Sequence, residues 1–129
     1  MLLLIGCALV PVETARFQLA ISLRFRPSRA REWDELRRYD PEVLIVMPCG
    51  FDLARAKDDA RRLPSLPGWS ELAAVRTART FVADGNAYFN RSGPRIIDSL
   101  EMLAAMIHPR IFEGQFSGLA RHWSNGVVA

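Results

Sequence analysis

Residues 42–53, Glu42-Val-Leu-Ile-Val-Met-Pro-Cys-Gly-Phe-Asp-Leu53, decide the fold of this chain. The apolar run over residues 42–47 has the length and composition of a strand buried on both faces of a sheet. We expect a loop over residues 48–51, and Asp52 as the N-cap of a helix over residues 53–63 with apolar and charged residues on opposite sides. This stretch is therefore a strand–loop–helix unit.

A second unit of the same kind begins at residue 80. A strand over residues 80–83 leads into Asp84-Gly-Asn-Ala-Tyr-Phe-Asn-Arg-Ser-Gly-Pro-Arg95, a turn-forming stretch with two adjacent aromatic residues. Pro94 is compatible with the first turn of a following helix, which Ser92 can cap and which ends at His108-Pro109. This helix is strongly amphipathic, and its apolar side consists of Ile96, Ile97, Leu100, Leu103, Ala104 and Ile107.

Weaker elements surround the two units. The pattern predicts short strands over residues 2–10 and 17–23, a basic loop over 24–31, a short helix over 32–39, a helical turn over 69–75 and an irregular tail over 110–129. Strands that alternate with helices along the chain favour an α/β fold. We expect a short parallel sheet flanked by helices and joined by right-handed crossovers.

The bulk composition narrows the function classes. The chain has 129 residues, of which 50% are hydrophobic and 24% are charged, and this is enough for one domain with a packed core. The formal net charge is +3, and the basic residues are arginines apart from Lys57. Because the arginines are spread evenly, no nucleic-acid partner is predicted. No apolar run reaches the roughly 18 residues of a membrane span, so we do not expect an integral membrane protein.

The two cysteines give little support to a metal or redox site. Cys7 and Cys49 are far apart and form no CxxC motif, and the sequence leaves open whether they pair in a disulfide. Residues 4–7, Leu-Ile-Gly-Cys, have the form of a lipoprotein processing site. The apolar segment before Cys7 is too short for a signal and lacks basic residues, so we expect a strand there and no complete signal peptide.

Cys49 is the strongest candidate for a catalytic residue, because it follows a strand in a Pro-Cys-Gly turn. A cysteine nucleophile needs a base near it. His108 is predicted at a helix end and His122 in the tail, and neither position favours that role. Paired carboxylates such as Asp58-Asp59 lie on polar helix faces. We therefore predict a binding protein and no enzyme, with a cysteine-dependent enzyme that uses Cys49 as the alternative.

The predicted ligand site consists of the loops that follow the two strands, because the carboxyl ends of parallel strands meet at one edge of a sheet. Tyr88 and Phe89 offer an apolar platform, and Asn90 and Arg91 offer hydrogen-bond donors around it. A plain turn with a helix N-cap also explains this stretch, and that alternative stays open. Trp33 begins a helix that can reach the same edge, although its position on a helix by itself favours the core over the ligand edge.

Four segments carry a resemblance to a known family: Trp33-Asp-Glu-Leu36, Asp40-Pro-Glu-Val-Leu-Ile-Val-Met-Pro-Cys-Gly-Phe-Asp-Leu53, Leu72-Ala-Ala-Val-Arg76 and Val82 to Asp98. Over residues 29–109 they resemble the carboxyl-terminal lobe of cobalamin-type substrate-binding proteins of ABC importers, in the iron-siderophore and cobalamin class. The resemblance implies half of a helical-backbone (class III) periplasmic binding protein, in a periplasmic or extracytoplasmic location. Residues 1–28 do not resemble the family and form an unassigned segment.

The resemblance also implies roles for single residues. The side chains implied to contact the corrinoid are Tyr88, Phe89, Asn90 and Arg91, with the neighbouring wall from Cys49, Gly50 and Phe51, and Trp33 at the same edge. The acidic residue that docks this lobe to arginines of the permease corresponds to Asp34, or to Glu35 beside it. The resemblance implies cobalamin as the transported ligand and no other cofactor.

A corrinoid is a large, mostly uncharged disc edged with amides, which suits an apolar platform with a polar rim. A ferric siderophore or haem is the alternative ligand, because Arg91 and Arg95 suit an anionic one. The sequence contains no counterpart of the family's amino-terminal lobe or of its linking helix. We therefore expect weak binding by this lobe, which covers one face of the ligand.

Overall fold

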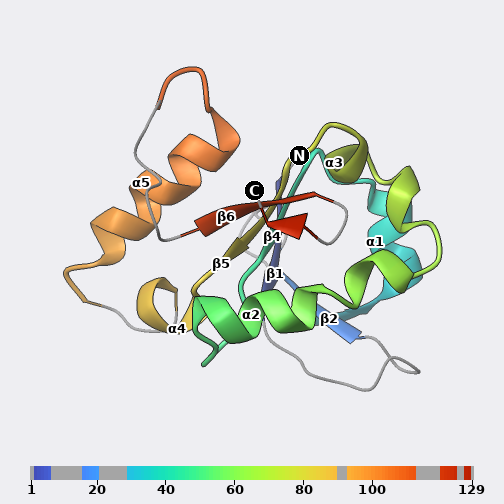
Figure 1. Ribbon diagram of the computed structural model, residues 1–129, viewed down its shortest axis with the longest axis horizontal. Helices are drawn as coiled ribbons and strands as arrows, with labels where there is room; N and C mark the ends of the chain where they lie inside the picture. The colour runs from blue at the N-terminus through green and yellow to red at the C-terminus, as the bar shows by residue number, and fades with distance from the viewer. Residues whose placement is uncertain are drawn as a thin grey trace.

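The computed structural model describes residues 2–6, 16–20, 29–89, 93–112, 120–124 and 127–128, and Figure 1 shows their arrangement. The strands in chain order are β1 (Leu2–Gly6), β2 (Arg16–Ala20), β3 (Arg29–Glu32), β4 (Val43–Val46), β5 (Thr80–Ala83), β6 (Ala120–Ser124) and β7 (Val127–Val128). The helices are α1 (Trp33–Tyr39), α2 (Leu53–Ala60), α3 (Ala73–Arg76), α4 (Gly85–Tyr88) and α5 (Ile96–Ile107), with 3-10 turns η2 (Leu63–Ser65) and η3 (Trp69–Glu71). The fold is α/β, as the sequence predicts.

The sheet is mixed, whereas the sequence predicted a parallel one. Its strand order is β3-β2-β1-β4-β5-β6-β7, and among the described strands the β1–β4 and β4–β5 pairs are the parallel ones. The other neighbours pair antiparallel. The links over residues 7–15 and 21–28 are shorter than the dozen or so residues that a parallel crossover needs, so β1, β2 and β3 have to alternate in direction.

Two further predictions need correction along the sheet. The predicted loop over residues 24–31 contains the start of β3, which pairs with β2. The predicted irregular tail contains β6 and β7, and β6 pairs with β5. Neither the sequence of β3 nor that of β6 has a clear alternating apolar pattern, and this is why the pattern did not predict them.

The core lies on both faces of β4, as its apolar run predicts. Leu44 and Val46 belong to one cluster of buried side chains, and Val43 and Ile45 belong to another. Helices α1, α2 and α3 contribute residues to the first cluster and α5 contributes to the second, which corresponds to the two sides of the sheet in Figure 1. The parallel strands are therefore covered by helices on both faces.

Local hydrogen bonds define where the helices begin and end. Helix α2 begins at the predicted N-cap, because the Asp52 carboxylate accepts a hydrogen bond of 2.9 Å from the Arg55 backbone N–H. The helix ends at Ala60, whereas the sequence predicted an end at residue 63. Pro64 in η2 is incompatible with a longer α2, because proline cannot continue a helix. Helix α1 ends at Tyr39, and its C-cap residue Asp40 adopts a left-handed conformation before Pro41.

Helix α5 ends where the sequence predicts, but it begins at Ile96 with Arg95 as its N-cap, so Pro94 lies before the helix and not in its first turn.

The side of α5 that faces the core is not the one with the large aliphatic residues. Its buried residues are Ser99, Met102, Ala105 and Met106. Part of the predicted apolar side lies outward: Ile96, Ile97 and Leu100 are 63%, 62% and 66% exposed. Leu103, Ala104 and Ile107 are half-buried, and Leu103 packs against the core cluster. The first turn and a half of the strongest apolar stripe in the sequence is therefore on the surface.

Two contacts fix the rotation of α5. The Ser99 hydroxyl lies within hydrogen-bond distance of the Tyr88 backbone carbonyl at the end of α4. At the other end of the helix, the Arg79 guanidinium donates a hydrogen bond of 2.7 Å to the Ile107 carbonyl. These bonds hold the methionine side against the sheet. The predicted cap Ser92 lies outside the described residues.

Candidate ligand-binding site

The loops that follow β4 and β5 lie against each other at the carboxyl ends of two parallel strands. The Asn86 backbone N–H donates a hydrogen bond of 3.1 Å to the Phe51 carbonyl. Gly85 packs so closely against the other loop that a Cβ atom at this position would collide with the Pro48 carbonyl oxygen. The absence of a side chain at Gly85 therefore allows the two loops to form one continuous surface.

The first loop exposes its tip and buries its aromatic residue. Gly50 has a φ of 74°, a conformation that favours glycine, and the Phe51 N–H closes the turn onto the Pro48 carbonyl at 3.3 Å. Cys49 and Gly50 are exposed. Phe51 is buried in the core cluster, and the Arg55 guanidinium lies 3.9 Å from the centre of its ring. Of the predicted wall, Cys49 and Gly50 therefore form the accessible part.

The second loop is both a capped turn and an aromatic wall. The Asp84 carboxylate accepts a hydrogen bond of 2.7 Å from the Ala87 N–H and so is the N-cap of α4. Tyr88 and Phe89 are half-buried and pack against the core cluster under α5. The Arg95 guanidinium lies 5.7 Å from the centre of the Tyr88 ring. Each aromatic ring is thus supported by the core and partly accessible.

Three of the residues discussed for this region cannot be placed. Asn90 and Arg91, the predicted polar rim, lie outside the described residues. Cys7, the possible disulfide partner of Cys49, lies outside them as well. The described part of the predicted site is therefore the aromatic wall and the Cys49-Gly50 tip.

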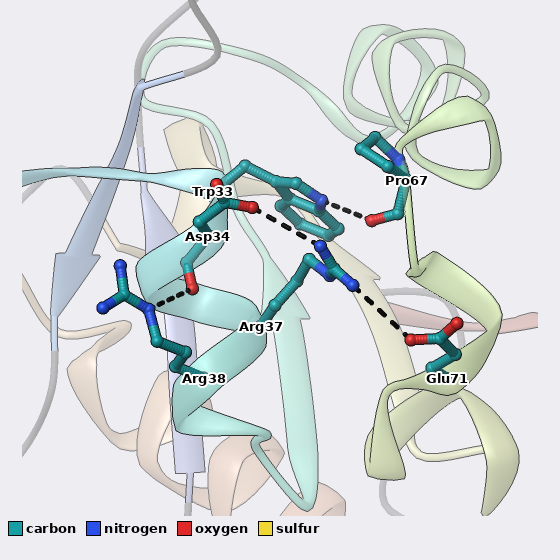
Figure 2. A network of polar contacts seen from close by, with 6 residues as sticks. All are labelled: Trp33, Asp34, Arg37, Arg38, Pro67 and Glu71. Atoms are coloured by element: carbon teal, nitrogen blue, oxygen red, sulfur yellow. Dashed lines mark hydrogen bonds and ion pairs between the residues drawn. The ribbon is translucent and has the colours of Figure 1, made fainter.

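Trp33 is a core residue and is not part of this surface. Its side chain is only 7% exposed, and the indole N–H donates a hydrogen bond of 2.7 Å to the Pro67 carbonyl (Figure 2). The ring stacks on Trp69 with a centroid distance of 6.2 Å. Because its ring and its polar atom are both occupied by the core, the expected position at the ligand edge is corrected.

The two acidic candidates on α1 have different surroundings. The Glu35 carboxylate accepts a hydrogen bond from the Glu32 backbone N–H and so belongs to the capping box of α1. The Asp34 side chain is 72% exposed and lies 3.5 Å from Arg37, which also reaches Glu71 at 3.5 Å (Figure 2). Asp34 is therefore the more accessible of the two carboxylates.

The Asp34 network borders a groove that the sequence reasoning missed. The groove has a volume of about 550 Å³ and is lined by Asp34, Arg37, Arg38, Asp40, Gly68, Glu71 and Leu72. The i,i+3 spacing of Asp34 and Arg37 is a sequence signal for their pairing, but Glu71 reaches the groove only through the tertiary fold.

Near the end of α1, burial raises the pKa of the Tyr39 hydroxyl.

Of the two histidines considered as a base for Cys49, the structure describes the surroundings of His108. His108 follows the end of α5 that is bonded to Arg79, beside the amino end of β5. Cys49 follows the carboxyl end of β4, so the two lie at opposite edges of the sheet. For His122 the structure describes only the backbone, in β6.

The described residues contain neither a metal-ligand cluster nor a membrane-spanning helix. No group of three or more His, Cys, Asp and Glu side chains there has the arrangement of a metal site. No helix in the same part of the chain is long and apolar enough to cross a membrane.

Comparison with known proteins adds no relative to this geometry. No protein-family model matches the chain, and neither a curated protein nor a solved structure does. The α/β fold and the joined strand-end loops are therefore what is established of this chain.

Proposed function

We propose that this chain is a substrate-binding lobe of an ABC importer binding protein, and that it takes cobalamin or a related corrinoid. The observation that carries the proposal is the junction between the two strand-end loops. The Asn86–Phe51 hydrogen bond and the Gly85–Pro48 contact bring Tyr88, Phe89 and Cys49 to one edge of the sheet. Crevices outside the carboxyl ends of parallel strands are the usual ligand positions in open α/β sheets.

The chemistry of this edge fits a flat, largely uncharged ligand. Tyr88 and Phe89 provide aromatic surface that the core supports from behind. The backbone bond between the loops limits their movement, so little conformational entropy is lost when a ligand binds. An apolar wall with a few polar groups at its rim is the common composition of a small-molecule site.

Permease docking belongs to a different surface in this proposal. Asp34 lies on α1, which packs on the opposite face of the sheet from the cluster that holds Tyr88 and Phe89. Its exposed carboxylate is suited to an arginine of the permease. Ligand binding and docking can therefore be changed separately.

A ferric siderophore is the second candidate ligand, and Arg95 is the observation that favours it. The exposed Arg95 guanidinium lies over the Tyr88 ring, so a cation stands beside the aromatic wall. Such a pair suits an anionic ligand more than a neutral one.

The test is a calorimetric titration of the purified chain with cyanocobalamin and, separately, with a ferric siderophore. We expect weak binding of cyanocobalamin, and a loss of affinity of about tenfold in Tyr88→Ala, because the ring contact is removed. Tyr88→Phe keeps the ring and should bind like the original chain. Arg95→Gln should leave cobalamin affinity unchanged, whereas a siderophore would lose affinity in this variant.

Matched controls separate binding from folding. Phe112→Ala also removes an aromatic ring but lies beyond α5, and it should not change the affinity. Cys49→Ser should bind almost as well as the original chain, and loss of a catalysed turnover in that variant would favour the enzyme instead. If neither ligand gives heat of binding while the chain is folded by circular dichroism, the proposal is wrong.

A further inference from the structure

Another cavity lies where α5 ends beside the start of β5. Cys49 and the candidate ligand wall follow the carboxyl ends of β4 and β5, so this cavity is at the opposite edge of the sheet. Its volume is about 450 Å³, which is typical of a small-molecule site. The described residues that line it are Arg79, Ile107, His108, Pro109, Arg110 and Ile111. It is therefore a site separate from the strand-end loops.

The described lining carries positive charge and no carboxylate. Arg79 and Arg110 contribute guanidinium groups, and His108 contributes an imidazole. Arg79 donates to the Ile107 carbonyl from a single nitrogen, Nη2, and a guanidinium has four further N–H donors, about as many as two ligand oxygens accept. Glu42 interacts electrostatically with Arg79 but is not among the described lining residues. The cavity therefore suits an anion, and because Glu42 offsets part of the charge, a single negative charge is sufficient.

Hydrogen-bond donors compensate the negative end of α5, which would otherwise disfavour an anion there. The Ile107 carbonyl accepts the bond from Arg79 at 2.7 Å. The His108 carbonyl accepts the backbone N–H groups of Ile111 and Phe112 at 3.0 and 3.2 Å. These bonds also order the turn that follows the helix, so the lining loses little conformational entropy when a ligand binds.

The rest of the lining is apolar, which selects an anion with an apolar part. Ile111 is 73% exposed, the highest value among the large hydrophobic side chains that the structure describes. Ile107 and Pro109 lie in the same lining. A fully hydrated inorganic anion would leave these side chains in contact with water, whereas an alkyl chain would cover them. An arginine fork matches the two oxygens of a carboxylate head group.

We propose that the cavity at the end of α5 binds a small carboxylate with an apolar tail, of the class of a medium-chain fatty acid. The guanidinium groups of Arg79 and Arg110 hold the carboxylate, and the tail lies along Ile107, Pro109 and Ile111. The proposal does not depend on what the strand-end loops bind, because the two sites share none of their described residues.

The test is a titration of the isotopically labelled full chain with octanoate, followed by NMR of the backbone amides. We expect saturable shifts at Arg79 and over residues 107–112. Octylamine and 1-octanol have the same tail without the negative charge, and both should bind at least about tenfold more weakly. Octylamine that binds as well as octanoate would overturn the proposal. Shifts confined to residues 85–89 would place the anion on the strand-end loops and overturn it as well.

One pair of substitutions tests the head group. Arg110→Gln should lower the octanoate affinity about tenfold, because one of the two guanidinium groups is lost. Arg76→Gln removes an exposed arginine from α3, which packs on the opposite face of the sheet, and it should not change the affinity. Equal affinities of the two variants would mean that Arg110 does not hold the carboxylate.

A second pair of substitutions tests the tail. Ile111→Ser should lower the affinity about fivefold, because apolar surface that the tail covers is lost. Ile97→Ser removes a similarly exposed side chain at the other end of α5 and should have no effect. Arg110 and Ile111 are both exposed, so circular dichroism should show that their variants fold. A folded original chain that gives no saturable shift at millimolar octanoate overturns the proposal.

Discussion

At the scale of the residue, Gly85 has the greatest influence on the geometry of the candidate site. Any side chain there meets the Pro48 carbonyl, and the two strand-end loops would have to separate. We expect Gly85→Ala to lower the free energy of unfolding by about 1 to 3 kcal/mol, the usual cost of overpacking a close contact. Chemical denaturation followed by circular dichroism measures this change.

Gly93 provides the matched control for that substitution. A Cβ atom at Gly93 would have no atom within 4 Å, so Gly93→Ala should be neutral or slightly stabilising. Equal stability of the two variants would show that the loops tolerate a side chain between them. Where ligand affinity is measurable, Gly85→Ala should lower it and Gly93→Ala should leave it unchanged.

At the scale of the element, the start of α2 depends on one side chain. The Asp52 carboxylate accepts the Arg55 N–H, which is one of the donors that the first turn leaves without a partner. Asp52→Ala should cost about 1 kcal/mol of stability, and Asp52→Ser should keep most of it. Thermal unfolding by circular dichroism distinguishes the two.

A second carboxylate on α2 is a control for charge alone. Asp58 lies 3.1 Å from Arg61, and both side chains are mostly exposed, so Asp58→Ala should change stability by only about 0.3 to 0.5 kcal/mol. If Asp58→Ala and Asp52→Ala are equally destabilising, the loss of the capping bond is not the cause of the lower stability.

A helix N-cap such as Asp52 could be predicted because the acceptor side chain and the start of the helix are neighbours in the sequence.

At the scale of the whole molecule, β4 couples the two faces of the sheet. Ile45 packs under α5, whereas Trp33 and Trp69 lie in the cluster on the opposite face. We expect Ile45→Ala to cost about 2 to 5 kcal/mol and to shift the tryptophan fluorescence transition as much as the circular dichroism transition, because both faces share one strand. A Trp123→Phe background limits the fluorescence to Trp33 and Trp69.

Leu44→Ala is the corresponding change on the tryptophan face and should shift both signals by a similar amount. A fluorescence transition that does not move in Ile45→Ala would mean that the two faces unfold independently. The sequence does not predict this coupling, because it depends on which residues of β4 meet which helices.

Local signals gave the α/β class, the buried strand β4, the cap at Asp52 and the end of α5. Each of these depends on residues within a few positions of one another, so spacing along the chain is sufficient. The sequence also predicts that the two strand-end loops meet, because neighbouring parallel strands end at the same edge of a sheet.

The tertiary structure alone decided which side of α5 is buried, that Trp33 lies in the core and that the sheet is mixed. Apolar periodicity shows that a helix has an apolar side, but not whether the sheet or another molecule covers it. The Ser99 and Arg79 contacts, distant in sequence from their partners, fix that rotation and leave Ile96, Ile97 and Leu100 outward. The core position of Trp33 likewise depends on its contacts with Pro67 and Trp69, which lie beside it only in the folded chain. Long-range contacts of this kind leave no periodic pattern in the sequence, and for that reason only the folded structure shows them.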